Sequence, residues 1–176
     1  MTGRPIAITD IETTGLDPMI HEIIEIGLLV LDQKTFEVTD RLDIKVRPEH
    51  IETAQASALT VNGYREEDWR EAISLKEAMA LYAEKTRGAI FCSHNVTFDW
   101  FFMHEAFRKT GVGHALDYHR IDLFTLAWAK LRKSDLEHFT MNAVAQYLGL
   151  EKEPDPHRAM GGATLACEVY KRLMKE

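Results

Sequence analysis

The fold of this chain follows from the segment PIAITDIETTGL, residues 5–16, in which an apolar run passes directly into two carboxylates and a glycine turn. The first part of the segment, PIAITDIE, is rich in β-branched side chains, which favours a strand. Two further runs of this type follow after short turns: EIIEIGLLVLD (22–32) and FEVTDRLDIKV (36–46). Because the connections are short, the three strands are predicted to form an antiparallel meander.

After a loop that contains Asn62 and Gly63, the periodicity changes to that of alternating helices and strands. Ser74 and Glu77 form the pattern of a capping box, and Gly111 is typical of a helix end. Helices are predicted over 74–86, 96–111, 124–132, 141–148 and 159–174, and short strands over 88–94 and 118–123. This order predicts one α/β domain over residues 1–176, with a mixed sheet of three antiparallel strands and then parallel strands, flanked by helices.

The composition is that of an ordinary globular protein. The 176 residues include 45% hydrophobic and 28% charged residues, which is typical of a folded domain. The net charge of −7 gives the surface no general attraction for nucleic acid, which argues against a protein that coats nucleic acid without specificity. Any binding of phosphate must therefore be local, through metal ions or a small basic patch.

The two cysteines, Cys92 and Cys167, lie in apolar contexts and lack CxxC spacing, so they are predicted to be buried, reduced thiols. The N-terminal residues lack the long apolar core of a signal peptide. The chain also has no run of about 18 apolar residues, the length that a membrane-spanning helix needs. These features predict a cytoplasmic protein that makes no membrane contact.

Carboxylates at the ends of two predicted strands are the first candidate functional residues. Asp10 and Glu12 are two residues apart on a strand, so their side chains share one face and can share divalent cations. The pattern D-x-E also arises by chance, and a second copy at 135–137 is interpreted as solvated surface. Asp99 falls in the first turn of a predicted helix, where the helix dipole alone would stabilise it. In open α/β sheets, however, ligands commonly bind at such strand ends.

His157 is the third candidate, because it follows the rigid segment Pro154-Asp155-Pro156 and immediately precedes a helix. A histidine held in this way is suited to act as a general base. The alternative is a surface histidine or one that only satisfies hydrogen bonds, which is the interpretation given to most of the other histidines.

In their order and spacing these residues resemble the DEDD family of 3′–5′ exonucleases, in the branch that uses a histidine base. This branch, DEDDh, includes the proofreading subunit of DNA polymerase III, RNase T and oligoribonuclease. The stretch D-x-E-T-T-G-L at 10–16 is similar to the first family motif, and H-N-x-x-F-D at 94–99 is similar to the second. H-R-A-M at 157–160, with Ala163, resembles the third motif, H-x-A-x-x-D-A. ALTVNGY at 58–64 is similar to a stretch of RNase T-like members.

The resemblance implies an RNase H-like sheet, two Mg²⁺ or Mn²⁺ ions, and single-stranded DNA or RNA 3′ ends as partners. Asp10 would bridge the ions, Glu12 would help to hold the ion that activates water, and Asp99 would hold the second ion. His157 would take the proton from the attacking water. The resemblance also implies contacts with the 3′-terminal nucleotide, and a homodimer is possible. The residues expected at or near that nucleotide are Thr13, Thr14, Gly15, Leu16, Leu59 and Asn95.

The chain departs from the family pattern at position 162, where the fourth acidic ligand is replaced by Gly162. Together with Gly161 it also weakens the helix start, at about 1 kcal/mol for each glycine. Water could fill the metal shell at a cost in affinity. Glu168 and Asp155 are interpreted as poor substitutes, and no compensation is visible in the sequence.

Three hypotheses remain open. The first is a 3′–5′ exonuclease that releases nucleoside monophosphates, strongly attenuated by the glycine at position 162. The second is a catalytically inactive module of the same fold that binds nucleic-acid ends. The third is an α/β scaffold whose carboxylates are only solvated. The sequence leaves the choice between DNA and RNA open.

Overall fold

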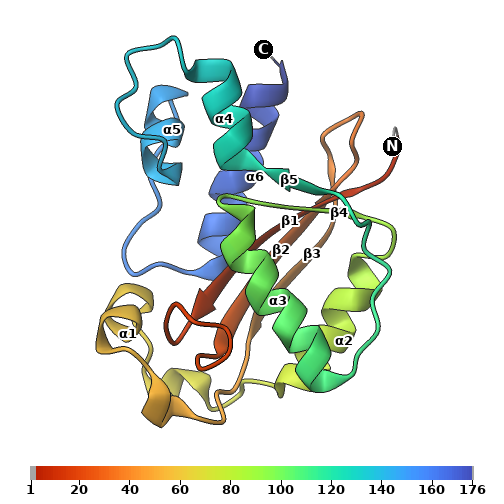
Figure 1. The fold of residues 1–176 in the computed structure, drawn as a ribbon, viewed down its shortest axis with the longest axis vertical. Coiled ribbons are helices and arrows are strands. Elements are labelled where there is room, and N and C mark those ends of the chain that lie inside the picture. The colour runs from red at the N-terminus through yellow and green to blue at the C-terminus, as the bar shows by residue number, and fades with distance from the viewer. Residues whose placement is uncertain (1–2, 176) are drawn as a thin grey trace.

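The computed structural model describes residues 3–175, which form a five-stranded sheet with helices on both faces (Figure 1). The strands lie in the order β3-β2-β1-β4-β5. β1 (Ile6–Thr13), β2 (Ile23–Leu31) and β3 (Val38–Lys45) pair antiparallel, whereas β4 (Ile90–Ser93) pairs parallel with β1, and β5 (Arg120–Asp122) pairs parallel with β4. The predicted meander and the mixed sheet are confirmed.

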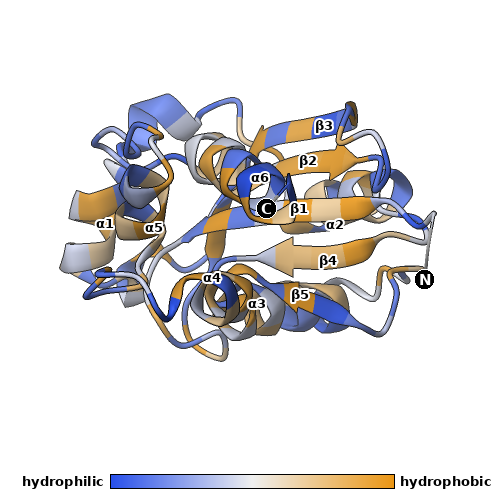
Figure 2. Ribbon diagram, turned by 90° about the horizontal axis from the view of Figure 1, so that it is seen from above, coloured by the Kyte–Doolittle hydropathy of each residue, from blue (hydrophilic) through white to orange (hydrophobic). Residues whose placement is uncertain are grey.

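The alternation of side chains along the strands divides the core between the two faces of the sheet. Ala7 and Ile11 of β1 pack with α2 (Leu75–Lys85) and α3 (Val96–Thr110), whereas Ile6 and Ile8 pack with α4 (Leu123–Leu131) and α6 (Ala159–Lys175). A third apolar cluster joins α4, α5 (Met141–Tyr147) and α6. Figure 2 shows the inner strands as mostly hydrophobic, whereas β3 at the edge alternates.

The predicted helix ends are present. Ser74 and Glu77 form the expected capping box of α2, Thr140 caps α5, and Gly111 ends α3 in the left-handed conformation. The two cysteines are buried and free, as expected. Within residues 3–175, no helix combines the length and the apolar character needed to cross a membrane.

The assignment of the segment around Asn62 to a loop is wrong. It contains α1 (Ala56–Asn62), with short 3₁₀ turns at Ile51–Thr53 and Glu66–Trp69. Only Asn62 of α1 is buried, so the helix has no apolar periodicity to reveal it. Tertiary hydrogen bonds hold it instead: the Asn62 amide donates to the Thr13 carbonyl, and the His157 N–H donates to the Val61 carbonyl.

Helix α6 approaches the sheet unusually closely at its first turn. A Cβ at Gly27 would collide with the Ala159 carbonyl group and would lie 2.6 Å from the Met160 nitrogen. Gly27 is the register partner of Asp10 on the neighbouring strand. The glycine therefore allows the start of α6 to lie directly over the end of β1, which is where the candidate functional residues are found.

Candidate functional site

Strand alternation places Asp10 and Glu12 at the end of an apolar row on β1. Ile6 and Ile8 occupy the preceding positions of this row and are buried in the core against α6. The row becomes acidic just before β1 shifts its register between Glu12 and Thr13. Both carboxylates are half-buried, and they lie two residues apart at the end of β1, as expected.

Asp99 reaches the same place from the first turn of α3. The carboxylate of Asp122 in β5 accepts a hydrogen bond from the Val96 N–H, which fixes the start of α3 beside the sheet. Asp99 is almost fully buried. Burial raises its pKa to about 7, against opposing contributions from the Ser93 hydroxyl and the Ile11 backbone.

The electrostatics of this region are those of crowded negative charge. Burial is the largest cause that raises the pKa of Glu12 to about 8, followed by the carboxylates of Glu153 and Glu25, whereas Arg158 lowers it. Burial and neighbouring carboxylates also raise the pKa of Asp10 well above its ordinary value. The charges are therefore gathered without enough cations to balance them.

The three expected ligands fit divalent metal ions. Asp10, Glu12 and Asp99 all offer carboxylate oxygens, the hard donors that Mg²⁺ and Mn²⁺ prefer. Repulsion among these carboxylates raises the pKa of Asp10, and a divalent cation between them would relieve it.

His157 lies near Glu12, in the loop before α6. Its backbone N–H donates to the Val61 carbonyl over 3.0 Å, which ties the loop to α1. The ring is partly exposed, with Nδ1 3.8 Å from a Glu153 oxygen and Nε2 3.8 Å from an Asp155 oxygen. Glu12, Glu153 and His157 each offer a ligand atom within 4.8 Å of the others. The predicted proximity of His157 to the carboxylates is therefore present.

Gly162 has a packing reason that the sequence does not reveal. A Cβ at this position would lie 2.6 Å from Cγ of Asp10, so the Asp10 carboxyl group occupies the space of the missing side chain. Position 162 therefore faces Asp10 directly, and the glycine leaves room for the Asp10 carboxyl group next to α6.

A groove of about 270 Å³ opens beside Glu12, between the end of β1 and α1. Two of the predicted nucleotide contacts, Thr13 and Leu16, line it, and the Leu16 side chain is 72% exposed. Its full lining is Ile11, Glu12, Thr13, Leu16, Gln55, Ser57, Ala58, Val61, Asn62 and Phe98. The groove has an apolar wall and a carboxylate at its inner end, which suits a nucleoside next to a phosphate.

Some predicted contacts lie elsewhere. Leu59 is half-buried and is not part of the groove lining, because neighbouring α1 residues face the groove instead. Asn95 lines a separate open cavity with Phe124 and His94. Phe98 packs against the core and also lines the groove.

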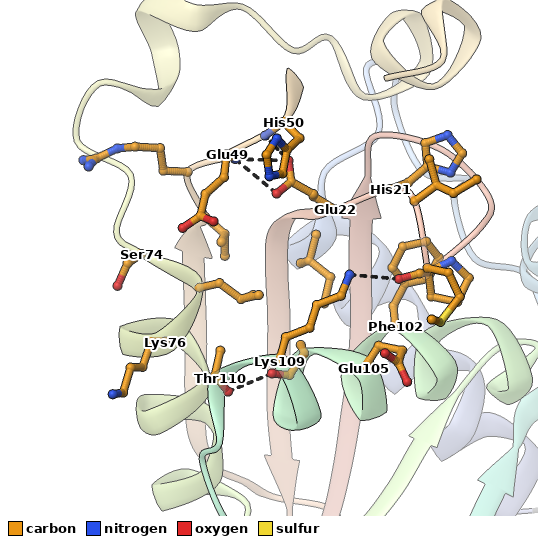
Figure 3. A pocket seen from close by; sticks show the side chains of 18 residues that line it. His21, Glu22, Glu49, His50, Ser74, Lys76, Phe102, Glu105, Lys109 and Thr110 are labelled. Carbon is orange, nitrogen blue, oxygen red and sulfur yellow. Dashed lines mark hydrogen bonds between the residues drawn. The ribbon is translucent and has the colours of Figure 1, made fainter. Parts of the chain in front are cut away.

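Thr14 and Gly15 support the loop over residues 14–22. The Thr14 hydroxyl is buried and accepts from the Glu22 N–H, and the His21 ring packs so closely on Gly15 that a Cβ there would collide with it. On the other side of this loop lies a cavity of about 600 Å³ (Figure 3). There the Lys109 ammonium donates to the Pro18 carbonyl. These contacts hold the loop that carries Leu16.

Sequence reasoning missed two glutamates of the site. Glu25 is the register partner of Glu12 on β2, accepts from the Ala159 N–H, and forms an ion pair with Arg158. A lone carboxylate in the otherwise apolar run of β2 could have indicated it. Glu153 comes from an irregular loop, and its position in the sequence carries no comparable signal.

The five-stranded mixed sheet, flanked by helices and with acidic residues at the end of its first strand, defines an RNase H-like α/β protein. Residues 7–170 match the exonuclease family that is named for RNase T. The chain therefore belongs to the DEDD family of 3′–5′ exonucleases.

Relatives and solved structures agree with this assignment. The chain is 28% identical over 168 residues to DNA polymerase III PolC-type of Thermotoga petrophila, and 27% identical over 169 residues to that of Caldanaerobacter subterraneus. Each match covers 96% of this chain but only 12% and 11% of the relative. Escherichia coli exonuclease I in complex with a dT13 oligonucleotide superposes with a TM-score of 0.80 at 16% identity, over 98% of this chain and 41% of that one. A 3′-exonuclease that recognises a histone mRNA stem-loop gives 0.76 at 19% identity, over 98% and 64%. At these identities the structures establish the shared fold.

Proposed function

We propose that this chain is a 3′–5′ exonuclease that releases nucleoside monophosphates from the 3′ end of single-stranded nucleic acid. The observation that carries the proposal is that Glu12 and His157 offer ligand atoms within 4.8 Å of each other beside a groove of about 270 Å³. Asp10 and Asp99 lie close enough to interact electrostatically with Glu12. These residues come from different elements and follow the order of the family motifs that the sequence resembles.

Asp10, Glu12 and Asp99 would hold two divalent metal ions, Mg²⁺ or Mn²⁺. When bound, such ions lower the pKa of water and neutralise charge on the reacting phosphate. His157, on the open side of the carboxylates, accepts the proton of the attacking water. A Glu153 oxygen and an Asp155 oxygen each lie 3.8 Å from one of its two ring nitrogens.

The groove would hold the 3′-terminal nucleoside. Leu16 on one lip and Phe98 on the wall provide apolar surface for the sugar and base, while Thr13 and Asn62 fix the end of β1 through the Asn62 amide. Gly15 and Thr14 hold the loop that carries Leu16. This arrangement orients the terminal phosphodiester toward Glu12.

The activity of this chain is proposed to be strongly attenuated, because Gly162 offers no carboxylate to the metal site. Changing Gly162→Asp restores the motif residue and is expected to raise the rate at saturating Mn²⁺ by at least tenfold. An unchanged or lower rate contradicts attenuation by this position.

The competing proposal is an inactive module that binds nucleic-acid ends. The crowded carboxylates of the site, whose charges are not balanced by cations, favour this proposal if metal ions bind too weakly for catalysis. Matched single strands of DNA and RNA, labelled at the 3′ end, separate the two when binding and mononucleotide release are measured together in Mn²⁺. Binding without release, in both this chain and the Gly162→Asp variant, supports the module. Comparison of the two strands gives the preference between DNA and RNA.

A homodimer and a cytoplasmic location stay predictions. Sedimentation analysis of the purified chain tests the first, and localisation of a tagged full-length protein tests the second.

A further inference from the structure

Glu153 brings a carboxylate to the site from outside the family motifs. It lies in the loop before α6 and is mostly buried, with its Oε2 3.8 Å from Nδ1 of His157. Among the carboxylates that raise the pKa of Glu12, that of Glu153 has the largest effect. It can approach Glu12 within 4.8 Å, the spacing of groups that share an ion.

The two glycines at the start of α6 leave room for two carboxylates. A Cβ at Gly162 would collide with the Asp10 carboxyl group, and a Cβ at Gly161 would lie 3.2 Å from Oε1 of Glu153. Side chains at these positions would crowd both carboxylates. The helix therefore lacks a carboxylate at position 162, and the glycine pair leaves room for the carboxylates of Asp10 from β1 and Glu153 from the preceding loop.

Glu153 is positioned by the fold but is not neutralised by the nearest arginine. Its N–H donates to the Asn142 side chain of α5 over 3.0 Å, which anchors the loop. Arg158 points instead to Glu25 and lies over the Trp69 ring. The carboxylate of Glu153 accepts one hydrogen bond, from the Arg158 N–H at 3.3 Å, and its other oxygen faces His157.

We propose that Glu153 is a fourth carboxylate ligand of the metal site and replaces in part the residue that the family motif has at position 162. This inference rests on the proposed function, since it assumes that Asp10, Glu12 and Asp99 bind divalent ions. It differs from a purely structural role, in which Glu153 only accepts the Arg158 N–H and caps α6.

Binding of Mn²⁺ to the full chain, measured by calorimetry and by the electron paramagnetic resonance signal of free Mn²⁺, tests the proposal. The Glu153→Gln change keeps the Oε1 acceptor that caps α6 but removes the charge. It is expected to weaken Mn²⁺ binding at least tenfold. Glu168→Gln is the matched control, because Glu168 pairs with Lys171 further along α6. It is expected to leave the Mn²⁺ dissociation constant within twofold of that of the unchanged chain.

The Glu12→Gln variant distinguishes failure of this inference from failure of the proposed function. Weaker binding in Glu12→Gln with unchanged binding in Glu153→Gln overturns the inference alone. Unchanged binding in both variants overturns the metal site itself. Melting curves in chelator check folding. If Glu153→Gln fails to fold, Glu153→Asp serves instead, because its carboxylate is withdrawn by one methylene and is expected to weaken binding at least threefold.

A double variant adds an independent readout. With Asp at position 162, the site has its motif ligand, so removing the Glu153 charge should matter less. Glu153→Gln is therefore expected to weaken Mn²⁺ binding less in the Gly162→Asp background than in the chain as given. The fold-change in the dissociation constant should be at least three times smaller in that background. Equal effects in the two backgrounds contradict the substitution of one ligand for the other.

Discussion

The carboxyl group of Asp10 lies where the side chain of residue 162 would begin, and a Cβ on Gly162 would be 2.6 Å from Asp10 Cγ. The relationship couples the first strand to the last helix. A substitution at position 162 therefore affects packing as well as metal binding, because any side chain there must displace Asp10.

The Gly162→Asp change is expected to destabilise the metal-free chain at pH 8 by about 1–3 kcal/mol, because it crowds Asp10 and adds a charge to an acidic site. Urea denaturation in chelator measures this. Gly113→Ala, in open space on the surface, is the control and should change the free energy of unfolding by less than about 0.5 kcal/mol. A Gly162→Asp chain as stable as the original would show that Asp10 moves aside without cost.

The pH dependence of stability follows from the raised carboxyl pKa values. The folded pKa is about 8 for Glu12 and about 7 for Asp99, above the ordinary values of 4.5 and 3.8, so the folded chain binds more protons than the unfolded chain between these limits. Stability from these groups is full below about pH 4 and is lost as pH rises through 7 and 8. The metal-free chain is expected to lose at least about 2 kcal/mol between pH 5 and pH 8.5.

Denaturation curves at several pH values in chelator check this prediction. The Glu12→Gln variant, which cannot ionise at this position, should show a flatter dependence. Addition of Mn²⁺ at pH 8 should recover stability, by about 2.7 kcal/mol at one hundred times the dissociation constant. An increase in stability from pH 5 to pH 8.5 in chelator would contradict the raised pKa values of Glu12 and Asp99.

The close approach of α6 to the sheet predicts a strong effect at Gly27. Gly27→Ala places a Cβ against the Ala159 carbonyl and the Met160 nitrogen, which are backbone atoms that cannot move without shifting the helix. A loss of about 3 kcal/mol or more is expected in the free energy of unfolding, at the upper end of overpacking effects. Gly113→Ala is again the control, and equal stability of the two variants would contradict the packing.

The groove predicts a change in substrate binding rather than in chemistry. Leu16→Ala removes exposed apolar surface at the lip and is expected to raise KM three- to tenfold with kcat within twofold, measured by mononucleotide release. Met19 belongs to the same loop and is similarly exposed, but it lines the cavity on the other side of the loop. Met19→Ala is therefore the matched control. Equal effects of the two changes would mean that the loop, and not the groove, controls binding.

Local patterns were sufficient to predict the sheet and to place the acidic candidate residues at strand ends. Alternation along β1 places Asp10 and Glu12 on one face, and strand ends bring Asp99 to the same region. Helix caps at Ser74 and Thr140 are local signals as well. These features depend on residues that are close in the sequence, so periodicity and spacing reveal them.

The remaining features depend on contacts between residues far apart in the chain. Helix α1 is held by Thr13 and the His157 loop instead of by its own apolar face. The space beside Gly162 is filled by Asp10, and Glu153 reaches Glu12 only after the loop before α6 has folded. No local pattern specifies such contacts, which is why Glu153 and the role of the glycine pair emerged only from the structure.

The most direct test of the central claim is release of mononucleotides from a 3′-labelled single strand, comparing this chain with Glu12→Gln, with and without Mn²⁺. Asp155→Asn, at a largely exposed carboxylate of the His157 loop, is the control. The account predicts stepwise release from the 3′ end in Mn²⁺, none in chelator, a loss of at least one hundredfold in Glu12→Gln and less than threefold in Asp155→Asn. Release that is unaffected by chelator or by Glu12→Gln would contradict it, as would the absence of release from both this chain and the Gly162→Asp variant.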